Sequence, residues 1–309
     1  GIKTLQPVIQ DDIVCIFNGE IYNYKELNAE SKSDVYSIIF AYNKYGNEFT
    51  RYLDGEFTIV LFDFKKGTFI ISGDIFKTKP LFYNVDEDIV ISSYESSCKS
   101  IKYQKYTSIK PNETLIFDLK TRKLLEKKKI CEFDLKQKKD NYDDFVKALE
   151  KSILKRYPED SIPLVGVSSG LDSGAISLCL RKHNKPALFI SFPKNEDINV
   201  LKARQEILKP NHLFLDINPE EKAFWKKDLM DNCEKFTWDF SVSKELWESK
   251  EYHEALWGWR RTRARGMIHN GMDMGSMLAR SKMIAITKQI EHSEGQKIRV
   301  LYSGIGADE

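Results

Sequence analysis

The segment Pro163–Gly174, with the sequence PLVGVSSGLDSG, runs from a short apolar stretch directly into a turn rich in serine and glycine. A helical pattern follows at once, because Ala175, Ile176 and Leu178 place apolar side chains at helical spacing. A buried strand that leads through such a turn into a helix is typical of an open parallel sheet, whose strand ends face the ligand crevice. This segment decides the fold class that we expect for the second half of the chain.

The turn Ser168–Gly174 offers several groups that bind phosphate. Its successive backbone N–H groups lie at a helix N-terminus, where the helix dipole favours an anion, and Ser168 and Ser173 add hydroxyl donors. Asp172 would repel a polyphosphate unless a cation lay between them, so we interpret it as a Mg²⁺ ligand. Helix capping is the alternative, because serine and aspartate also cap helices that bind no ligand.

A second turn of the same kind follows the apolar segment Arg299–Tyr302, where Ser303–Glu309 reads SGIGADE. Two strand ends that each offer Ser, Gly and Asp can hold one polyphosphate from both sides. Asp172 and Asp308 would then share Mg²⁺, an ion that prefers a few carboxylates together with phosphate oxygens. The two turns together favour nucleotide binding over helix capping.

Strands and helices alternate around these turns, which predicts an α/β domain with a parallel sheet covered by helices on both faces. The first 125 residues instead read as short strands and turns around one helix at 33–45, which predicts an α+β domain with antiparallel pairing. We expect a front domain at 1–125, a charged linker at 126–140 and a second domain at 141–309. The strands expected in front are Ile13–Phe17, Phe57–Phe64, Thr68–Ser72, Leu81–Tyr83, Ile89–Ser92 and Thr114–Asp118.

The composition narrows the class of protein. With 48 basic and 46 acidic residues the net charge is only +2, so no global field attracts nucleic acid or an anionic membrane. No apolar run reaches the roughly 18 residues of a membrane span. An odd number of scattered cysteines favours a reducing, cytoplasmic setting. One cluster, Trp257–Arg265, interleaves aromatic and basic residues; nucleic-acid stacking, arginines lying over apolar surface and a substrate-carboxylate clamp are its alternatives, and we do not expect nucleic acid.

The turns resemble two motifs of the asparagine synthetase superfamily, since SSGLDSG is similar to its SGGLDSS loop and SGIGADE to its SGEGADE stretch. FNGEIYNYKEL at Phe17–Leu27 resembles the FNGEIYNY segment of the class II glutamine amidotransferase domain that precedes the synthetase. DGEF at Asp54–Phe57 and the segment Gly73–Tyr83 resemble two further stretches of that domain. The motifs occur in the family's order and cover nearly the whole chain, as in a diverged or truncated member.

The resemblance implies an αββα sandwich of the N-terminal-nucleophile hydrolase type in front, followed by a domain like the adenine-nucleotide alpha-hydrolases. It implies glutamine-dependent asparagine synthesis: ATP adenylates the aspartate side-chain carboxylate and releases pyrophosphate, and ammonia from glutamine then displaces AMP. Glutamine, aspartate and ATP are the implied partners, ATP and Mg²⁺ the implied cofactors, and a homodimer is compatible with this scheme.

The resemblance also assigns site residues. Asn18 and Gly19 match the oxyanion hole, and together with Glu20 and Asp54 they match the glutamine site, where the two carboxylates hold an α-ammonium group. A hairpin turn is the alternative for Asn18-Gly19. The metal positions are Asp172 and Asp308. The positions implied for ATP and pyrophosphate are Ser168, Ser169, Gly170, Leu171, Asp172, Ser173, Ser303, Gly304 and Gly306.

Several departures leave alternatives open. The family's nucleophile is an N-terminal cysteine, whereas residue 1 is Gly and Cys15 lies inside an expected strand. We expect further residues at both ends of the full-length protein; loss of glutaminase activity is the alternative. Ser169 replaces a Gly, Gly174 a Ser and Ile305 an acidic residue. A β-lactam-synthetase-like enzyme without glutaminase activity and a non-catalytic nucleotide-binding or scaffold relative are therefore alternatives.

Overall fold

The structure is a computed structural model that describes residues 4–86, 88–100, 105–134, 136, 139–194, 196–232 and 274–302. The chain divides into two compact units, Gly1–Asn141 and Tyr142–Glu309. Each unit has its own sheets and its own hydrophobic cores. Within the described ranges, no helix combines the length and the apolar character needed to cross a membrane.

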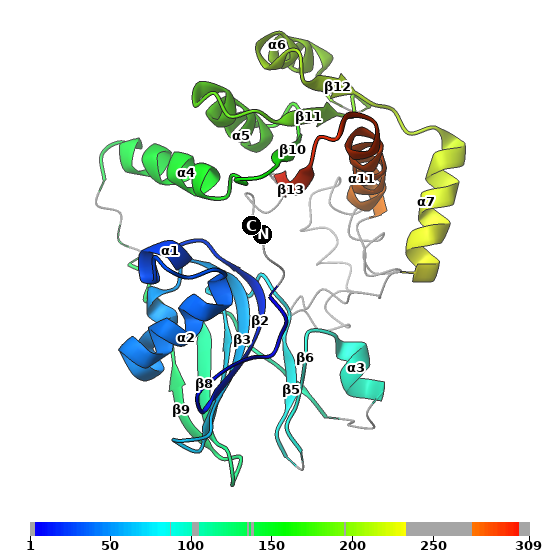
Figure 1. The fold of residues 1–309 in the computed structure, drawn as a ribbon. Coiled ribbons are helices and arrows are strands. Elements are labelled where there is room, and N and C mark those ends of the chain that lie inside the picture. The colour runs from blue at the N-terminus through cyan, green and yellow to red at the C-terminus, as the bar shows by residue number, and fades with distance from the viewer. Residues whose placement is uncertain are drawn as a thin grey trace. The chain divides into compact units, whose positions relative to one another are not determined.

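The first unit is a mixed α/β unit dominated by antiparallel pairing, as the sequence predicts. A six-stranded sheet has the order β1-β2-β3-β4-β8-β9, and a three-stranded sheet has the order β6-β5-β7. Helix α2 lies on one side of the large sheet, and β5 and β6 lie on the other side with α3 beyond them (Figure 1). The elements are β1 (Val8–Gln10), β2 (Ile13–Ile21), α1 (Tyr24–Leu27), α2 (Asp34–Tyr45), the 3-10 helix η1 (Gly46–Tyr52), β3 (Gly55–Asp63), β4 (Thr68–Gly73), β5 (Phe82–Asn84), β6 (Val90–Ser92), α3 (Glu95–Ser100), β7 (Thr107–Ser108), β8 (Glu113–Asp118) and β9 (Leu124–Lys128).

Strand β3 shows why this unit needs two cores. Successive side chains of a strand point to opposite faces of its sheet. Phe57, Ile59 and Leu61 therefore pack in the core that includes α2, whereas Val60 and Phe62 pack in the core formed with the three-stranded sheet. Burial on both faces explains why this strand reads as a nearly continuous apolar run rather than as an alternating pattern.

Two predictions for the first unit are wrong. We expected a strand to end at Asn18-Gly19, but β2 continues to Ile21, paired with β3 as far as Gly55. We also expected a linker from residue 126, but β9 extends to Lys128 and pairs with β8 at the edge of the sheet. An edge strand can keep its side chains in solvent, so the charges of 126–128 did not mark a linker.

The second unit contains a parallel sheet with the strand order β12-β11-β10-β13. The boundary between the units falls beside residue 141, where we expected the second domain to begin. The strand–turn–helix arrangement at 162–182 is as the sequence predicts, although the helix begins at Leu171 rather than at Gly174. The elements are α4 (Asp143–Lys155), β10 (Ile162–Gly166), α5 (Leu171–Lys182), β11 (Leu188–Ser191), α6 (Ile198–Leu208), β12 (His212–Phe214), α7 (Pro219–Asn232), α11 (Met274–Glu294) and β13 (Ile298–Tyr302).

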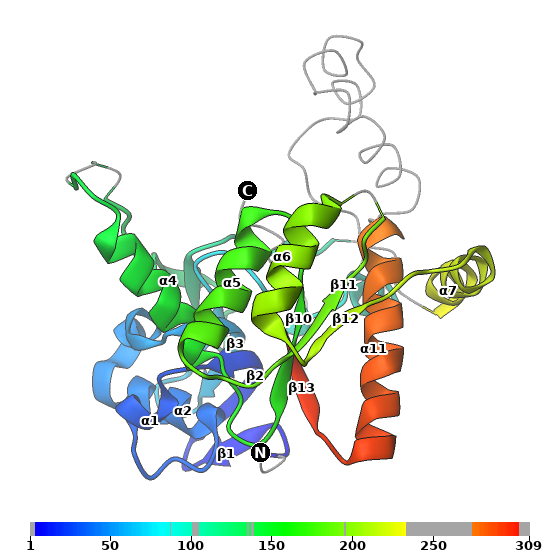
Figure 2. The same cartoon turned by 90° about the horizontal axis from the view of Figure 1, so that it is seen from above.

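Helices cover both faces of this parallel sheet. Val165 and Phe189 point into a core that they share with α4, α5 and α6, whereas Leu164 and Ile190 share the opposite core with Met283 of α11. Figure 2 shows α5 and α6 on one side of the strands and α11 on the other. The neighbouring side chains of each strand thus serve different cores, which requires strands that are apolar on both faces.

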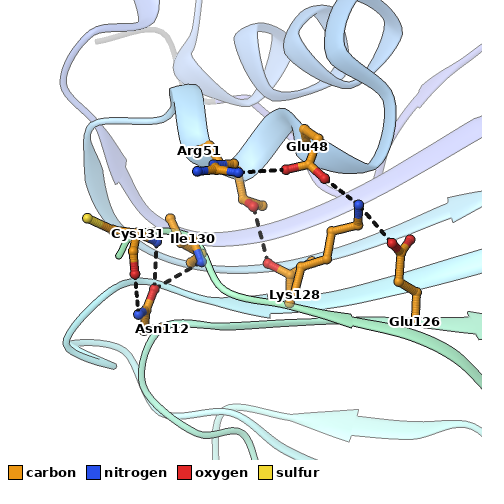
Figure 3. Close-up of polar contacts among 9 residues, drawn as sticks. Glu48, Arg51, Asn112, Glu126, Lys128, Ile130 and Cys131 are labelled. Atoms are coloured by element: carbon orange, nitrogen blue, oxygen red, sulfur yellow. Dashed lines mark hydrogen bonds and ion pairs between the residues drawn. The ribbon is translucent and has the colours of Figure 1, made fainter. Parts of the chain in front are cut away.

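Ion pairs tie the edge strand β9 to η1 in the first unit. Lys128 lies between Glu48 and Glu126, bonding Glu48 and lying 2.8 Å from a carboxylate oxygen of Glu126, as Figure 3 shows. Arg51 contacts Glu48 at 3.4 Å. The side-chain oxygen of Asn112 accepts hydrogen bonds from the backbone N–H groups of residues 130 and 131. These contacts hold residues 126–131, the first part of the segment in which we expected a linker.

Candidate functional site

A close main-chain contact fixes the backbone at Gly19 in the first unit. Gly19 has φ +146°, and a Cβ there would lie 1.9 Å from the carbonyl oxygen of Glu56 on β3. At Gly55, at the same end of this pairing, a Cβ would lie 2.2 Å from the carbonyl oxygen of Glu20. Only glycine fits such an approach. The Asn18-Gly19 pair is therefore a strand feature and not the hairpin turn that was its alternative.

Asn18 borders a cavity of about 250 Å³ between the two sheets. Its side-chain amide donates to the hydroxyl of Ser93 at 3.3 Å. The other walls are mainly apolar side chains of both sheets, among them Val60, Phe62 and Ile91. A polar amide thus lies at the border of an apolar cavity, which is the common composition of a small-molecule site.

The outer edge of β2 beside Asn18 is held by side chains rather than by another strand. The amide of Gln6 bonds both backbone groups of Phe17: it accepts from the N–H at 2.6 Å and donates to the carbonyl at 2.8 Å. A carboxylate oxygen of Asp34 accepts from the N–H of Ile21 at 3.2 Å. Because backbone groups alternate along a strand, Gly19 faces the same edge between these two residues. Gln6 and Asp34 were not singled out from the sequence.

Carboxylates gather at the end of β2. Glu20 lies directly opposite Glu56 in the pairing of β2 with β3, and the hydroxyl of Tyr22 donates to Glu56 at 2.9 Å. Although Glu20 is exposed, partial desolvation raises the pKa of its carboxyl group; Asp34 and Glu56 raise it further and Lys79 opposes them. Like charges directly opposite each other destabilise a sheet, so this arrangement favours a bound cation.

Asp54 lies at the turn that precedes β3. Its carbonyl accepts from the N–H of Tyr22 at 2.7 Å, and its own N–H donates to the side-chain oxygen of Asn23 at 2.9 Å. The structure therefore brings Asp54 to the end of β2 where Glu20 lies, joined to it through the chain at Tyr22. The two carboxylates of the predicted glutamine site belong to neighbouring segments.

Asp74 organises the segment that follows β4. It is 2 % exposed, and its carboxylate accepts from the N–H groups of Phe57 at 3.1 Å, Phe76 at 2.9 Å and Thr78 at 3.0 Å, and from the Thr78 hydroxyl at 2.5 Å. Its backbone N–H also donates to the carbonyl of Phe57 at 2.9 Å. Asp74 therefore fixes the strand residue paired with Gly19. The sequence marked Asp74 only as part of a motif.

Cys15 lies on β2 but faces the core. It is fully buried, and burial raises the pKa of its thiol to about 12. A thiol with so high a pKa carries almost no thiolate at neutral pH, and the thiolate is the nucleophile. Cys15 is therefore a packing residue, as its position in an apolar strand indicated.

In the second unit, the turn after β10 is braced by its own serines. The hydroxyl of Ser173, which is buried, accepts from the N–H of Ser168 at 3.0 Å and lies 2.8 Å from the Ser168 hydroxyl. The N–H of Gly170 donates to the Ser168 hydroxyl at 3.2 Å. Gly170 has an ordinary φ of −69°, and Ser169 is not among the residues with positive φ. Ser169 therefore fits this turn without backbone strain.

Two charged side chains from beyond the turn hold one of its peptide groups. The guanidinium of Arg204 on α6 donates to the carbonyl of Ser168. On the other side, a carboxylate oxygen of Glu196 accepts from the N–H of Ser169 at 2.6 Å and also from its hydroxyl. Neither Glu196 nor Arg204 was predicted, because nothing near them in the sequence indicates that they lie beside this turn.

Asp172 lies in the first turn of α5, where its side chain is partly exposed. Leu171, the residue before Asp172, is exposed and is the first residue of α5. Ser303, Gly304, Gly306 and Asp308, the predicted second turn, lie outside the described residues, and so does the cluster Trp257–Arg265. In the part of the chain that the structure describes, no three His, Cys, Asp or Glu side chains gather as a metal site.

A buried serine–histidine pair lies next to this turn. The hydroxyl of Ser191 donates to the carbonyl of Val167 at 2.7 Å, and it lies 2.7 Å from Nε2 of His212. His212 is 5 % exposed, its Nδ1 has no hydrogen-bond partner, and burial lowers the pKa of its ring. Neutral His212 thus joins the end of β11 to the start of β12 just behind the turn.

Comparison with known proteins identifies the first unit. Residues 2–132 match the family model described as "Glutamine amidotransferase domain". The chain is 31% identical over 191 residues to "Asparagine synthetase [glutamine-hydrolyzing] 2" of Oryza sativa subsp. japonica, covering 58% of this chain and 32% of that protein. It is 23% identical over 273 residues to a putative asparagine synthetase [glutamine-hydrolyzing] 2 of Methanocaldococcus jannaschii, covering 74% of this chain and 51% of that protein.

A solved structure of glutamine phosphoribosylpyrophosphate amidotransferase from B. subtilis is 16% identical, with a TM-score of 0.36, over 61% of this chain and 49% of that one. The chain spans about a third to a half of the length of the two asparagine synthetase relatives. The first unit thus carries a glutamine amidotransferase domain at residues 2–132, and the chain is similar to glutamine-hydrolysing asparagine synthetases along most of its length.

Proposed function

We propose that this protein is a glutamine-dependent amidotransferase of the asparagine synthetase type. It adenylates the side-chain carboxylate of aspartate with ATP, releases pyrophosphate, and forms the amide with ammonia taken from glutamine. The observation that carries the proposal is the turn after β10, where the N–H and the hydroxyl of Ser169 already hold a carboxylate oxygen. These donors suit a phosphate oxygen equally well, and they lie at the N-terminus of a helix.

The proposed chemistry explains how an unreactive carboxylate can form an amide. A carboxylate does not react with an amine until one of its oxygens becomes a good leaving group, and adenylation provides this. Ser168–Ser173 would bind the polyphosphate, and Asp172 and Asp308 would hold Mg²⁺, which would neutralise charge on the departing pyrophosphate. Asp172 fits this role because its carboxylate follows the donor turn directly.

The first unit would supply ammonia. Asn18 and Gly19 would donate to the oxygen that becomes negative when the glutamine amide is attacked. The Asn18 amide donates to Ser93 at 3.3 Å, a long hydrogen bond that a better acceptor can replace. Glu20 and Asp54 would hold the α-ammonium group, and the raised pKa of Glu20 beside Asp34 and Glu56 supports a site that gains from a positive charge.

The direct experiment measures pyrophosphate release by the full-length protein with Mg·ATP, aspartate and either glutamine or ammonia. We expect aspartate-dependent release and asparagine as product. Release with another carboxylate but none with aspartate would overturn the substrate, and no release with any carboxylate would overturn the adenylation. Asparagine formed with ammonia but not with glutamine would restrict the proposal to the second unit.

A variant pair tests the assignment of the metal ligand. Asp172→Asn keeps the size of the side chain but removes its charge, so we expect pyrophosphate release to fall by about a hundredfold, in the range found for loss of one charge stabiliser. Glu206→Gln removes an exposed carboxylate from α6 and is the matched control. Equal activity of the two variants would remove Asp172 from the site.

A further inference from the structure

The peptide group between Ser168 and Ser169 is hydrogen-bonded to charged side chains through both its C=O and its N–H. Its carbonyl oxygen accepts from the guanidinium of Arg204, and its N–H donates to Glu196 at 2.6 Å. In a trans peptide the C=O and N–H point in opposite directions. A cation that holds the carbonyl on one side therefore aims the N–H to the other side, so the direction of this donor is set by Arg204.

Gly174 gives Arg204 the room to reach the turn. A Cβ on Gly174 would lie 2.4 Å from Nη2 and 2.8 Å from Cζ of Arg204. Gly174 is buried in the first half of α5, and Arg204 comes from α6. Gly174 is also one of the departures from the SGGLDSS motif, which has serine there. The absence of a side chain at Gly174 therefore leaves the space that the guanidinium of Arg204 occupies.

Glu196 is bound at the turn in the way that an anionic ligand would be. One carboxylate oxygen accepts from both donors of Ser169, its N–H and its hydroxyl. The Ser169 hydroxyl also accepts from the N–H of Asp197 at 3.3 Å, which fixes the start of α6 beside the turn. Ser169 is the second departure from the motif, and its hydroxyl supplies contacts that glycine at this position would lack.

We propose that Arg204 is a positioning residue that aims the N–H of Ser169 at the bound phosphate, and that Glu196 is an internal anion that competes for the same donor. The proposal rests on the proposed function, since it concerns the same nucleotide turn. Arg204 acts through the carbonyl of Ser168 and not by touching the ligand. Glu196 satisfies the N–H while no ligand is bound, because an unpaired donor in a partly buried turn costs free energy, and it leaves when a phosphate oxygen takes its place.

This arrangement predicts effects of opposite sign. Loss of Arg204 frees the peptide to rotate, so its N–H is no longer held toward the ligand. Neutralising Glu196 weakens the internal competitor, because hydrogen bonds to a charged acceptor are stronger than those to a neutral one. A purely structural role for both side chains would weaken binding in both cases.

The experiment measures the dissociation constants of inorganic pyrophosphate and of Mg·ATP by calorimetry on the full-length protein. We expect Arg204→Met to weaken both by about tenfold, the effect of one hydrogen bond to a charged group, and Arg204→Lys to restore most of the loss. Glu196→Gln should tighten both several-fold. Lys202→Met, which removes an exposed cation from the same helix, is the matched control and should change neither. Thermal unfolding verifies that each variant is folded.

A double variant tests the link with Gly174. Gly174→Ser should displace the guanidinium and weaken binding as Arg204→Ala does, and Gly174→Ser/Arg204→Ala should bind no worse than Arg204→Ala alone. Changes of the same sign in Arg204→Met and Glu196→Gln, or additive losses in the double variant, would overturn this inference while leaving the proposed function intact. If the wild-type protein binds neither pyrophosphate nor Mg·ATP, the proposed function fails and this inference fails with it.

Discussion

At Gly19 the main chains of β2 and β3 approach so closely that a Cβ would lie 1.9 Å from a carbonyl oxygen, whereas the turn after β10 is held by Arg204 and Glu196 from other segments. The first arrangement depends on backbone packing, which cannot relax without breaking the sheet. The second depends on charged side chains, and a ligand can replace one of them, Glu196. Backbone packing therefore suits a site that must hold a backbone donor fixed. Charged side chains suit a site that must admit a polyphosphate.

Gly19→Ala tests the backbone packing between β2 and β3, and it has the largest expected effect. The added methyl group meets the Glu56 carbonyl, and the residue must keep a positive φ that alanine disfavours. We expect the free energy of unfolding to fall by about 4 kcal/mol, at the upper end for single substitutions. Denaturant unfolding of the full chain measures it.

Gly67→Ala is the control for this prediction, because Gly67 also has a positive φ, +64°, but no atom lies within 4 Å of its added Cβ. It should cost about 1 kcal/mol, the backbone term alone. Equal losses for the two variants would show that the close approach at Gly19 contributes nothing.

Asp74→Ala sharpens the comparison between backbone packing and side-chain contacts. Here a buried carboxylate holds a packed backbone in place. Three N–H groups and one hydroxyl lose their acceptor, and buried donors left unsatisfied are costly. We expect a loss of about 3 kcal/mol in the free energy of unfolding. Asp118→Ala, at an exposed turn with a comparable bond to Thr121 at 2.6 Å, should lose much less; the reverse order would contradict the role given to burial.

The pH dependence of the stability of the second unit tests whether a positive charge on His212 is tolerated behind the turn after β10. Burial holds the pKa of His212 below the ordinary 6.5, so below that pH the unfolded chain binds a proton that the folded chain does not. Stability should therefore fall as the pH drops from 6.5 toward the folded pKa, by at most about 1.4 kcal/mol per pH unit for one proton.

Thermal unfolding between pH 5 and pH 8 measures this, and His212→Phe should flatten the profile. An unchanged slope in His212→Phe would assign the pH dependence to other groups.

Glu20→Gln has the smallest expected effect and the opposite sign. The raised pKa of Glu20 means that folding disfavours its ionised form, so at pH 7 the neutral variant should be more stable. We expect a gain of about 0.5 kcal/mol, the scale of one repulsive cross-strand pair, together with weaker glutamine binding. Unfolding at pH 7 and a glutaminase assay measure the two effects. A variant that loses stability would show that Glu20 supports the fold rather than a ligand.

The parts of the fold that the sequence predicts are those with a local cause. The hairpin of β3 and β4 follows from two apolar runs around a glycine turn, and the helix after β10 follows from apolar spacing. Strand β9 was missed because its charges face solvent at a sheet edge. Asn18-Gly19 suggested a turn because this dipeptide is the strongest hairpin signal, but here the glycine answers a contact with Glu56, far along the chain.

The same distinction applies to the candidate sites. The turn Ser168–Gly174 was identified from its own residues, and the front site from motifs. Glu196, Arg204, Gln6 and Asp34 were not, because each reaches its partner across a fold that only the structure displays. Chemistry that resides in one segment can be predicted from it, whereas the side chains that orient that segment come from elsewhere.

The place of β13 has a consequence for protein synthesis. The first unit pairs β2, β3 and β4 with their immediate neighbours along the chain, so these hairpins can form soon after they leave the ribosome. Strand β10 ends at Gly166, but its partner β13 begins only at Ile298, and the hydroxyl of Tyr302 at its end donates to the carbonyl of Ile153 in α4 at 2.7 Å. One edge of β10 therefore stays unpaired during much of translation, and open strand edges invite aggregation. We expect nascent chains stalled before β13 to remain protease-sensitive in the second unit and to gain protection once Tyr302 has emerged; equal protection before and after would show that β13 is dispensable for closure.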